Sequence, residues 1–299
     1  MSRPACRSCS SLNVSSIGAL PDGLSFAGVI QPEPLPGGVL WRCEDCYFVF
    51  RHPLLPTARY EELYRNGSAQ VWESELDRQD FRLVRQHMAE DTRGTNVLEI
   101  GCYTGKLLES LPKRYRLHGI ELNTEAARIA ASRGIEIVAG GAAELDGLSA
   151  KFDAIIACDV IEHLVNPLAF LEQLRAHLTV GGRVLISTGN SDAWLWRIFG
   201  TNYWYCSFPE HISFIGSRWL QAMLGRVGLK VTRMIAFNYL YPGLHPAAIQ
   251  TLARAALYGC SPGFYRKLRR SLRSETAEDV APPGCGATKD HVFCVMSAV

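Results

Sequence analysis

The stretch NVLEIGCYTGKLL, residues 96–108, decides how the rest of the chain is interpreted. A largely apolar run from Val97 to Ile100 fits a short, buried parallel strand. Residues 101–105 interrupt this run with glycines, and apolar residues resume at helical spacing after Lys106. We therefore predict a strand, a tight turn and a helix. Such a turn exposes backbone N–H groups at the carboxyl edge of a sheet, where open α/β folds bind nucleotide-like ligands.

The residues of the turn indicate which ligand it binds. Dinucleotide-binding enzymes use the pattern G-x-G-x-x-G, whereas this turn has Gly101 and Gly105, with Glu99 two residues before the first glycine. That carboxylate would repel a pyrophosphate, but it would attract S-adenosylmethionine (SAM), which carries a sulfonium and an ammonium group. The alternative is an ordinary turn between a strand and a helix.

The sequence E-I-G-C-Y-T-G resembles motif I of the class I SAM-dependent methyltransferases, usually E/D-x-G-x-G-x-G. The resemblance implies that Glu99, Gly101, Tyr103 and Gly105 contribute to SAM binding. Tyr103 replaces the middle glycine of the family, which affects how closely the backbone approaches the methionine part of SAM. The resemblance also implies an α/β fold with a Rossmann-like, seven-stranded sheet whose last strand is antiparallel.

The remaining segments supply the other elements of such a sheet. Further strands are predicted over residues 115–122, 135–138, 152–157, 183–187, 229–235 and 291–297. The last of these is expected to be the antiparallel partner in a hairpin at the sheet edge. Helices are predicted over residues 124–131, 167–178 and 217–227, with Asn123 or Thr124 as the cap of the first and a glycine cap over 179–182 after the second.

Glu121 ends the second predicted strand, twenty residues after Gly101. An acid in this position can accept hydrogen bonds from both ribose hydroxyls of a nucleoside. The alternative is a glutamate in solvent at the end of a strand. By the resemblance, Leu122 belongs to the same site, and Ala143 or Glu144 contacts the adenine edge.

The sequence FDAIIACDVIEHL, residues 152–164, closely matches the motif that follows the fourth strand in this family. The resemblance places Asp159 and Val160 beside SAM or the acceptor. Glu162 and His163 are expected to begin the next helix.

An aromatic-rich loop follows the fifth predicted strand and leads to Pro209, Glu210 and His211. In related enzymes, a P-E-H-x-x-F sequence lies beside the acceptor pocket. Histidine titrates in a range that suits deprotonation of an alcohol, so His211 is the leading candidate for a catalytic base, with Glu210 orienting it and His163 as the second candidate. The alternatives are a structural loop histidine at 211 and a cap or orienting residue at 163. The aromatic side chains suit either stacking on a sugar or flat ring or packing in a lid.

Two C-x-x-C pairs, Cys6 with Cys9 and Cys43 with Cys46, bracket a stretch rich in Gly and Pro. Four thiolates at this spacing suit tetrahedral Zn²⁺, and the metal would replace a core that about fifty residues could hardly build. A redox pair or chance spacing are the alternatives. The pattern resembles the N-terminal zinc module of some bacterial small-molecule and saccharide methyltransferases. Strands are predicted beside the second pair, over residues 41–43 and 46–50.

We expect the chain to contain three parts. These are a zinc-ribbon module over 1–52, a helical lead-in over 53–93, and the SAM-dependent methyltransferase domain over 94–299, with an insertion at about 238–289. The insertion is predicted to hold an apolar helix around 246–258, a basic run over 264–273 and a loop over 274–288. The basic run could make peripheral contact with a membrane, contact phosphate or an acidic substrate, or form a solvated helix face.

The composition fits a globular protein, with 299 residues, of which 47% are hydrophobic and 20% charged. A net charge of +2 argues against nucleic acid as a general partner. The first residues have no apolar signal segment, and no run reaches the length of a membrane span. Cysteines arranged for a metal fit a reducing compartment, so we expect a cytoplasmic protein.

The leading hypothesis is a cytoplasmic SAM-dependent methyltransferase that binds Zn²⁺ and methylates an oxygen atom of a small-molecule or saccharide acceptor. One alternative is a zinc-containing RNA methyltransferase whose basic run and zinc ribbon form the RNA surface, although the net charge and the lack of an N-P-P-Y sequence argue against it. Another is a non-catalytic partner protein with the SAM fold. Tyr103 is compatible with such a protein, whereas Glu99, Glu121 and Asp159 argue against it.

Overall fold

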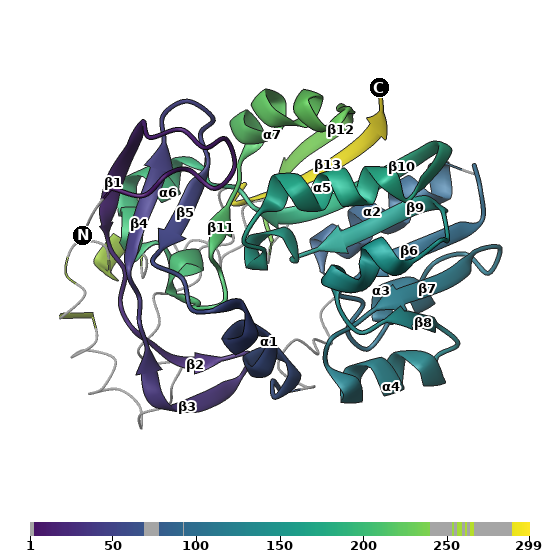
Figure 1. Ribbon diagram of the computed structural model, residues 1–299, viewed down its shortest axis with the longest axis horizontal. Coiled ribbons are helices and arrows are strands. Elements are labelled where there is room, and N and C mark those ends of the chain that lie inside the picture. The colour runs from purple at the N-terminus through teal and green to yellow at the C-terminus, as the bar shows by residue number, and fades with distance from the viewer. Residues whose placement is uncertain are drawn as a thin grey trace.

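The computed structural model describes residues 3–68, 78–91, 93–239, 253, 256–258, 261, 264–265 and 289–299. The described residues form a seven-stranded sheet, a four-stranded sheet and a two-stranded hairpin. Figure 1 shows the N-terminal strands, in purple, at one end of the molecule and the first strands of the large sheet, in blue, toward the other.

The large sheet has the order β12-β13-β10-β9-β6-β7-β8. Its strands are β6 (Asn96–Ile100), β7 (Arg116–Ile120), β8 (Glu136–Ala139), β9 (Phe152–Cys158), β10 (Leu178–Gly189), β12 (Leu229–Phe237) and β13 (His291–Ala298). The five strands from β10 to β8 pair in parallel, while β13 runs antiparallel to both β10 and β12. The predicted Rossmann-like sheet with its antiparallel last strand is confirmed.

The order of strands reverses between β6 and β9. From β6 the chain proceeds outward to β7 and β8, and it then returns to β9 and β10 on the other side. Open α/β sheets bind ligands outside the carboxyl ends of the strands at such a reversal. Gly101, Glu121 and Asp159 follow the ends of β6, β7 and β9, so the topology brings these three residues to one edge.

Seven α-helices have bounds that lie within the described ranges: α1 (Thr57–Arg65), α2 (Gln79–Glu90), α3 (Lys106–Glu109), α4 (Thr124–Ser132), α5 (Pro167–Ala176), α6 (Trp194–Phe199) and α7 (Ser217–Met223). Asn123 caps α4, because its side chain accepts hydrogen bonds from the backbone N–H groups of Glu125 and Ala126. The lead-in contains α1 and α2, and residues 69–77 between them lie outside the described part of the chain.

The predicted glycine cap over residues 179–182 is wrong. Helix α5 ends at Ala176 with His177 as its C-cap, and the chain then enters β10 at Leu178. The pairing of β10 with β9 shifts register before Arg183, and Gly181 adopts a φ of 78°. These glycines therefore allow an irregularity within a strand instead of ending a helix.

The N-terminal sheet has the order β1-β4-β5-β11. Its antiparallel strands are β1 (Val14–Ala19), β4 (Val39–Cys43), β5 (Val49–His52) and β11 (Ser213–Phe214). The two strands predicted beside the second cysteine pair correspond to β4 and β5. Strand β11 belongs to the segment that follows His211, so this sheet contains residues from both sides of the expected boundary at residue 52.

A hairpin that the sequence patterns did not indicate lies between the two cysteine pairs. It consists of β2 (Gly23–Phe26) and β3 (Val29–Leu35), joined by Ala27 and Gly28. These two residues have φ values of 46° and 77°, the positive angles that a two-residue type I′ turn requires. Gly28 adopts such an angle without strain, whereas alanine is not among the residues that favour this turn.

One hydrophobic core joins the N-terminal sheet to the large sheet. Phe48 and Phe50 are buried together with Trp219 of α7 and with residues of β9 and β10. The indole Nε1 of Trp219 donates a hydrogen bond to Ser8 Oγ at 2.9 Å, which connects α7 to the first cysteine pair. The N-terminal sheet therefore packs directly on the large sheet and on α7.

Most of the predicted insertion lies outside the described residues. The helix around 246–258, the basic run over 264–273 and the loop over 274–288 lie almost entirely outside the described residues. Among the helices of the described part, none combines the length and the apolar character needed to span a membrane.

Candidate functional site

Gly101 and Gly105 shape the turn between β6 and α3. Their φ values are 67° and 80°, which glycine adopts without strain. A Cβ atom at Gly101 would lie 2.9 Å from Val160 Cγ2, and one at Gly105 would lie 2.0 Å from Ile135 Cδ1. Both positions therefore need glycine for its backbone conformation and for its lack of a side chain.

Tyr103 adopts a glycine-like conformation although it has a side chain. Its φ is 48°, which costs a residue other than glycine about 1–2 kcal/mol. Its backbone N–H donates to Glu121 Oε2 at 2.8 Å, and its hydroxyl donates to the carbonyl oxygen of Ser68 at 3.3 Å. These contacts hold the turn in place and connect it to the segment that follows α1.

The Glu121 carboxylate lies between the turns that follow β6 and β7. Besides the Tyr103 N–H, it accepts the Asn123 N–H at 2.8 Å, and burial raises the pKa of this carboxyl group. The backbone N–H of Glu121 donates to Ala139 at the end of β8. After β8 the chain forms the 3-10 helix η1 (Ala142–Gly147), which includes Ala143 and Glu144, and Leu122 lies beside Gly141 at its start. The structure thus brings the predicted ribose and adenine residues into one region.

Arg78 and its partners form a charged group at this edge that the sequence patterns did not indicate. The Arg78 guanidinium donates to Asp80 Oδ2 and Asp159 Oδ2, both at 2.5 Å, and lies 4.4 Å from the centre of the Phe81 ring. The Tyr239 hydroxyl donates to the same Asp159 oxygen at 3.0 Å. Asp80 is fully buried in the first turn of α2. The helical lead-in thereby supplies the guanidinium of Arg78 and the carboxylate of Asp80 to the carboxyl edge of the large sheet.

Four buried carboxylate oxygens lack a hydrogen-bond donor among the described residues. Two of them are Oε2 of Glu99, a residue that is 3% exposed, and Oδ1 of Asp159. The other two belong to Glu210 and Asp290. Burial raises the pKa of Glu99 well above its usual range, although nearby Arg78 opposes this shift. Burial also raises the pKa of Asp159, to about 6. Unpartnered buried carboxylates fit a cationic ligand group such as the ammonium of SAM.

His211 lies beside the carboxyl ends of β9 and β10 with one ring nitrogen fixed. Its Nδ1 donates to the carbonyl oxygen of Tyr205 at 2.8 Å, because a carbonyl can only accept. Burial and the neighbouring His163 lower the pKa of His211 well below its usual range. The imidazole is therefore neutral at pH 7, and its Nε2 carries the lone pair.

Glu210 does not hold the His211 ring, since Tyr205 occupies that role. The Glu210 side chain is 7% exposed, and its Oε2 has no donor among the residues that the structure describes. Burial raises the pKa of this carboxyl group. Its backbone carbonyl instead lies 3.1 Å from His163 Nδ1.

His163 connects the segment after β9 with the lead-in helix. It ends the 3-10 helix η2 (Ile161–His163), four residues before α5 begins, and so does not open that helix as expected. Its Nδ1 lies 2.8 Å from the hydroxyl of Tyr64 in α1, and its ring centroid lies 5.0 Å from that of His211. Burial lowers the pKa of His163. The two candidate histidines thus lie together.

Glu162 joins these histidines to the end of β10. Its Oε2 accepts from the Thr188 hydroxyl at 2.9 Å, and its Oε1 accepts from the Tyr205 hydroxyl. Ligand-type atoms of Glu162, His163 and His211 lie within 4.8 Å of one another, a spacing that a metal ion could bridge. Both Glu162 oxygens already accept hydrogen bonds from Thr188 and Tyr205.

Most of the aromatic loop forms a packed cluster. Trp196, Tyr203 and Tyr205 are between 1% and 4% exposed, and they pack with Phe214 of β11. Trp194, in contrast, remains 55% exposed. The sequence allowed these aromatic side chains either to stack on a ligand or to pack in a lid. Packing accounts for the buried ones.

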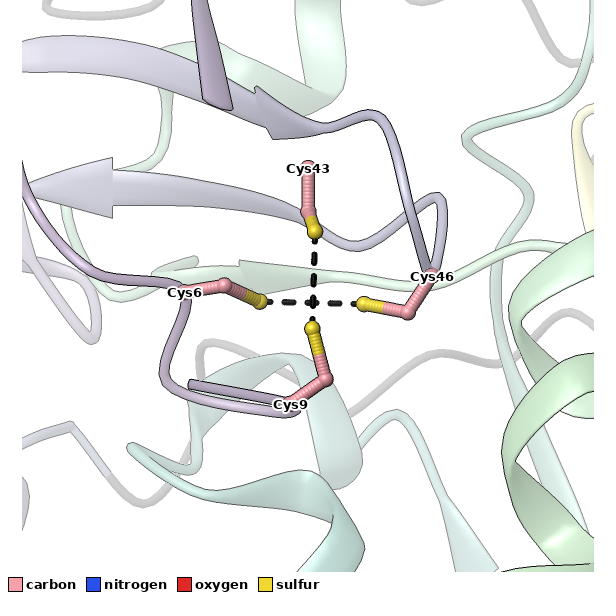
Figure 2. Close-up of side chains that lie close together, drawn as sticks. All are labelled: Cys6, Cys9, Cys43 and Cys46. Carbon is pink, nitrogen blue, oxygen red and sulfur yellow. Dashed lines mark hydrogen bonds between the residues drawn. The ribbon is translucent and has the colours of Figure 1, made fainter. Parts of the chain in front are cut away.

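The four cysteines of the two C-x-x-C pairs converge on one point, as Figure 2 shows. The Sγ atoms of Cys6 and Cys46 are 3.7 Å apart, and those of Cys9 and Cys43 are 3.5 Å apart. Tetrahedral Zn²⁺ with Zn–S bonds of about 2.3 Å places its sulfur ligands about 3.8 Å apart. The separations are far longer than the roughly 2.05 Å of a disulfide. The cluster therefore has the chemistry and the dimensions of a zinc site.

Comparison with known proteins identifies the class of protein to which this chain belongs. A family described as a methyltransferase domain matches residues 72–233, which is more than half of the chain. The chain belongs to this family, and thus to the class I SAM-dependent methyltransferases.

Individual relatives match just under half of the chain. An uncharacterized protein of Methanocaldococcus jannaschii is 26% identical over 133 residues, which are 44% of this chain and 63% of that protein. The ubiquinone biosynthesis O-methyltransferase of Aeromonas salmonicida is 28% identical over 162 residues, 49% of this chain and 67% of that enzyme. The chain thus spans about two thirds of the length of these relatives.

Solved structures show the same fold at low identity. A chain in the complex between the Haloferax volcanii Trm112 methyltransferase activator and a methyltransferase matches with a TM-score of 0.51 and 16% identity, covering 80% of this chain and 97% of that one. Coclaurine N-methyltransferase bound to N-methylheliamine and SAH matches with a TM-score of 0.51 and 12% identity, covering 83% of each chain.

Proposed function

We propose that this protein transfers the methyl group of SAM to an oxygen atom of a small-molecule or saccharide acceptor, with His211 as the general base. The observation that carries the proposal is the fixed, neutral imidazole of His211, whose Nδ1 is held by Tyr205 and whose Nε2 is left with a lone pair. The relatives named ubiquinone biosynthesis O-methyltransferases support oxygen as the methylated atom.

For SAM, we propose a site along the carboxyl ends of β6, β7, β8 and β9. Glu121 binds the ribose hydroxyls, Glu99 and Asp159 face the ammonium group, and Ala143 or Glu144 meets the adenine edge. The residues Gly101, Tyr103, Gly105, Leu122 and Val160 complete the site. The support for this placement is the unpartnered carboxylate oxygens of Glu99 and Asp159 and the hydrogen bonds between Glu121 and the turn after β6.

The proposed reaction is an in-line displacement that needs alignment and removal of one proton. SAM supplies an electrophilic methyl group on its sulfonium. An O–C bond forms to the acceptor as the S–C bond breaks, and His211 Nε2 takes the proton of the acceptor hydroxyl. Tyr205 stabilises the protonated ring, because its carbonyl oxygen continues to accept from Nδ1.

We also propose that Cys6, Cys9, Cys43 and Cys46 bind Zn²⁺. The support is the spacing of their sulfur atoms. Four protein ligands complete a tetrahedral site, so the metal would have a structural role. A cytoplasmic location follows as part of the proposal, since a reducing compartment keeps these thiols free for the metal.

The proposed function is tested by following radiolabelled methyl transfer from SAM to phenols and to hydroxylated sugars. His211→Ala should lower kcat by about 10²-fold or more, while the Kd for SAM stays within twofold of wild type. His118→Asn, in β7 and away from the cluster, is the matched control and should keep full turnover. Unchanged turnover in His211→Ala would assign this histidine to packing, and methylation of RNA alone would favour an RNA methyltransferase.

A further inference from the structure

Arg51, in β5 of the N-terminal sheet, is a buried arginine whose guanidinium contacts backbone carbonyl groups. It is 2% exposed. Its side chain donates to the carbonyl oxygens of Gly37 at 2.8 Å, Cys206 at 3.0 Å, Phe208 at 3.1 Å and His211 at 3.2 Å. A buried cation needs such acceptors, because water no longer solvates it.

Three of these four carbonyl groups belong to one short segment, residues 206–211. That segment begins directly after Tyr205, whose carbonyl oxygen fixes Nδ1 of His211. It also contains the hydrogen bond from the His211 backbone N–H to the Phe208 carbonyl oxygen. Arg51 therefore contacts carbonyl groups at both ends of the segment that carries His211.

Residues of the N-terminal sheet hold the following segment as well. The backbone N–H of Arg51 donates to the Ile212 carbonyl oxygen at 3.1 Å, and β11 pairs with β5. The same carbonyl oxygen accepts from Nη2 of Arg7 at 2.7 Å. Arg7 lies between Cys6 and Cys9, and its guanidinium is 5.4 Å from the centre of the Phe50 ring. A continuous chain of contacts therefore runs from the cysteine cluster to the histidine.

We propose that Arg51 is a positioning residue for His211, and that Arg7 extends this connection to the metal-binding cysteines. The inference rests on the proposed function, since it assumes that His211 is the base. In this account, the N-terminal sheet orients the catalytic segment through arginine–carbonyl contacts. Metal binding at the cysteines keeps Arg7 in position. The positive charge of Arg7 also suits a position beside the cysteines, because Zn²⁺ bound by four thiolates carries a net negative charge.

The experiment compares hydrogen exchange in the zinc-loaded full chain for wild type, Arg51→Met and Arg51→Lys. Lysine keeps the positive charge but lacks the planar group with five donors, so both variants should lose order in the segment. We expect amides of residues 206–214 to exchange at least about tenfold faster, while peptides from β6 to β8 remain protected. The matched control is Arg42→Met, from the neighbouring strand β4, which should exchange like wild type.

A second readout separates positioning from a purely structural role. Histidine-labelled protein is titrated by NMR. In Arg51→Lys, which keeps the positive charge near His211, the pKa of His211 should rise toward the ordinary value of about 6.5 as the ring leaves its fixed, buried position. Unchanged exchange and an unchanged His211 titration in Arg51→Lys would overturn the proposal. Should Arg51→Met fail to fold, Arg51→Lys decides the question.

The role of Arg7 is tested in the same way by removing the metal with a chelator and by Arg7→Met. Both changes should speed exchange of residues 212–214. If residues 212–214 exchange equally slowly before and after chelation, the part of the proposal that concerns the metal and Arg7 is overturned, and only Arg51 keeps its positioning role. These readouts do not depend on turnover, so a His211→Ala variant with full activity would overturn the proposed function without deciding the role of Arg51.

Discussion

The protonation of His211 determines how the proposed reaction depends on pH. A base must be neutral to accept a proton, and burial together with His163 lowers the pKa of His211 well below its usual range. The imidazole of His211 therefore stays neutral to a lower pH than that of an ordinary histidine. The acid limb of the plot of kcat against pH should have its midpoint below the ordinary value of about 6.5. An acid limb at or above 6.5 would contradict this assignment.

Glu99 should couple SAM binding to the release of a proton. Burial raises the pKa of Glu99, so the free protein retains a proton on this group to a higher pH than usual. A cationic ammonium beside it lowers that pKa, and binding then expels the proton. SAM affinity should therefore increase with pH until Glu99 is ionised in the free protein.

Calorimetry in buffers of different ionisation enthalpy measures this proton release. Glu99→Gln should bind SAM more weakly at high pH and should lose the Glu99-dependent part of the release. Leu122→Ala, a change without a titratable group in the same region, should retain it. Identical proton release in wild type and Glu99→Gln would remove Glu99 from the ammonium site.

At the residue scale, short sequence motifs suggest candidate site residues. Glu99, Glu121 and the four cysteines follow such local patterns. Arg78, Tyr64 and Arg51 do not, because their partners are 81, 99 and 155 residues away. Only the fold brings those pairs together, and no local spacing encodes them. The hydrogen bond from His211 Nδ1 to the Tyr205 carbonyl oxygen likewise depends on the folded loop.

At the scale of elements, the strands of the large sheet are predictable because most are buried on both faces and appear as apolar runs. Strand β11 has only two residues, too few for any pattern. Strand β3 contains Pro32 and Pro34, and most of its residues are exposed, so it lacks the alternation of a half-buried strand. The end of α5 was misplaced because glycines after a helix usually form its cap, whereas here they belong to β10.

The cysteine cluster makes a prediction about the N-terminal sheet. Cys43→Ser removes one ligand at the end of β4, so the purified protein should lose its zinc and the sheet should exchange its amide hydrogens faster. Metal analysis together with hydrogen exchange checks both results. The matched control, Cys294→Ala in β13, removes a buried thiol outside the cluster and should keep its zinc. Native protein that holds no metal at all would refute the zinc site.

At the scale of the whole molecule, the two sheets share a core and one segment contributes to both. The N-terminal sheet is completed by β11, and α7 contacts the first cysteine pair through Trp219 and Ser8. The sequence indicates a metal module and a methyltransferase domain, but it does not indicate this junction, which depends on residues about two hundred positions apart. In the proposed account, this junction connects the cysteine cluster to the segment that holds His211.

The central claim, a SAM site at the carboxyl edge of the large sheet, is tested most directly by calorimetric titration of the folded, metal-analysed protein with SAM. NADH serves as the comparison ligand. The account predicts one SAM site per chain and no binding of NADH. It also predicts that Glu121→Ala binds SAM about 2 kcal/mol more weakly, because the charged hydrogen bonds to the ribose are lost. Glu125→Ala, on the exposed face of α4, should bind like wild type. Folded protein that fails to bind SAM would contradict the claim.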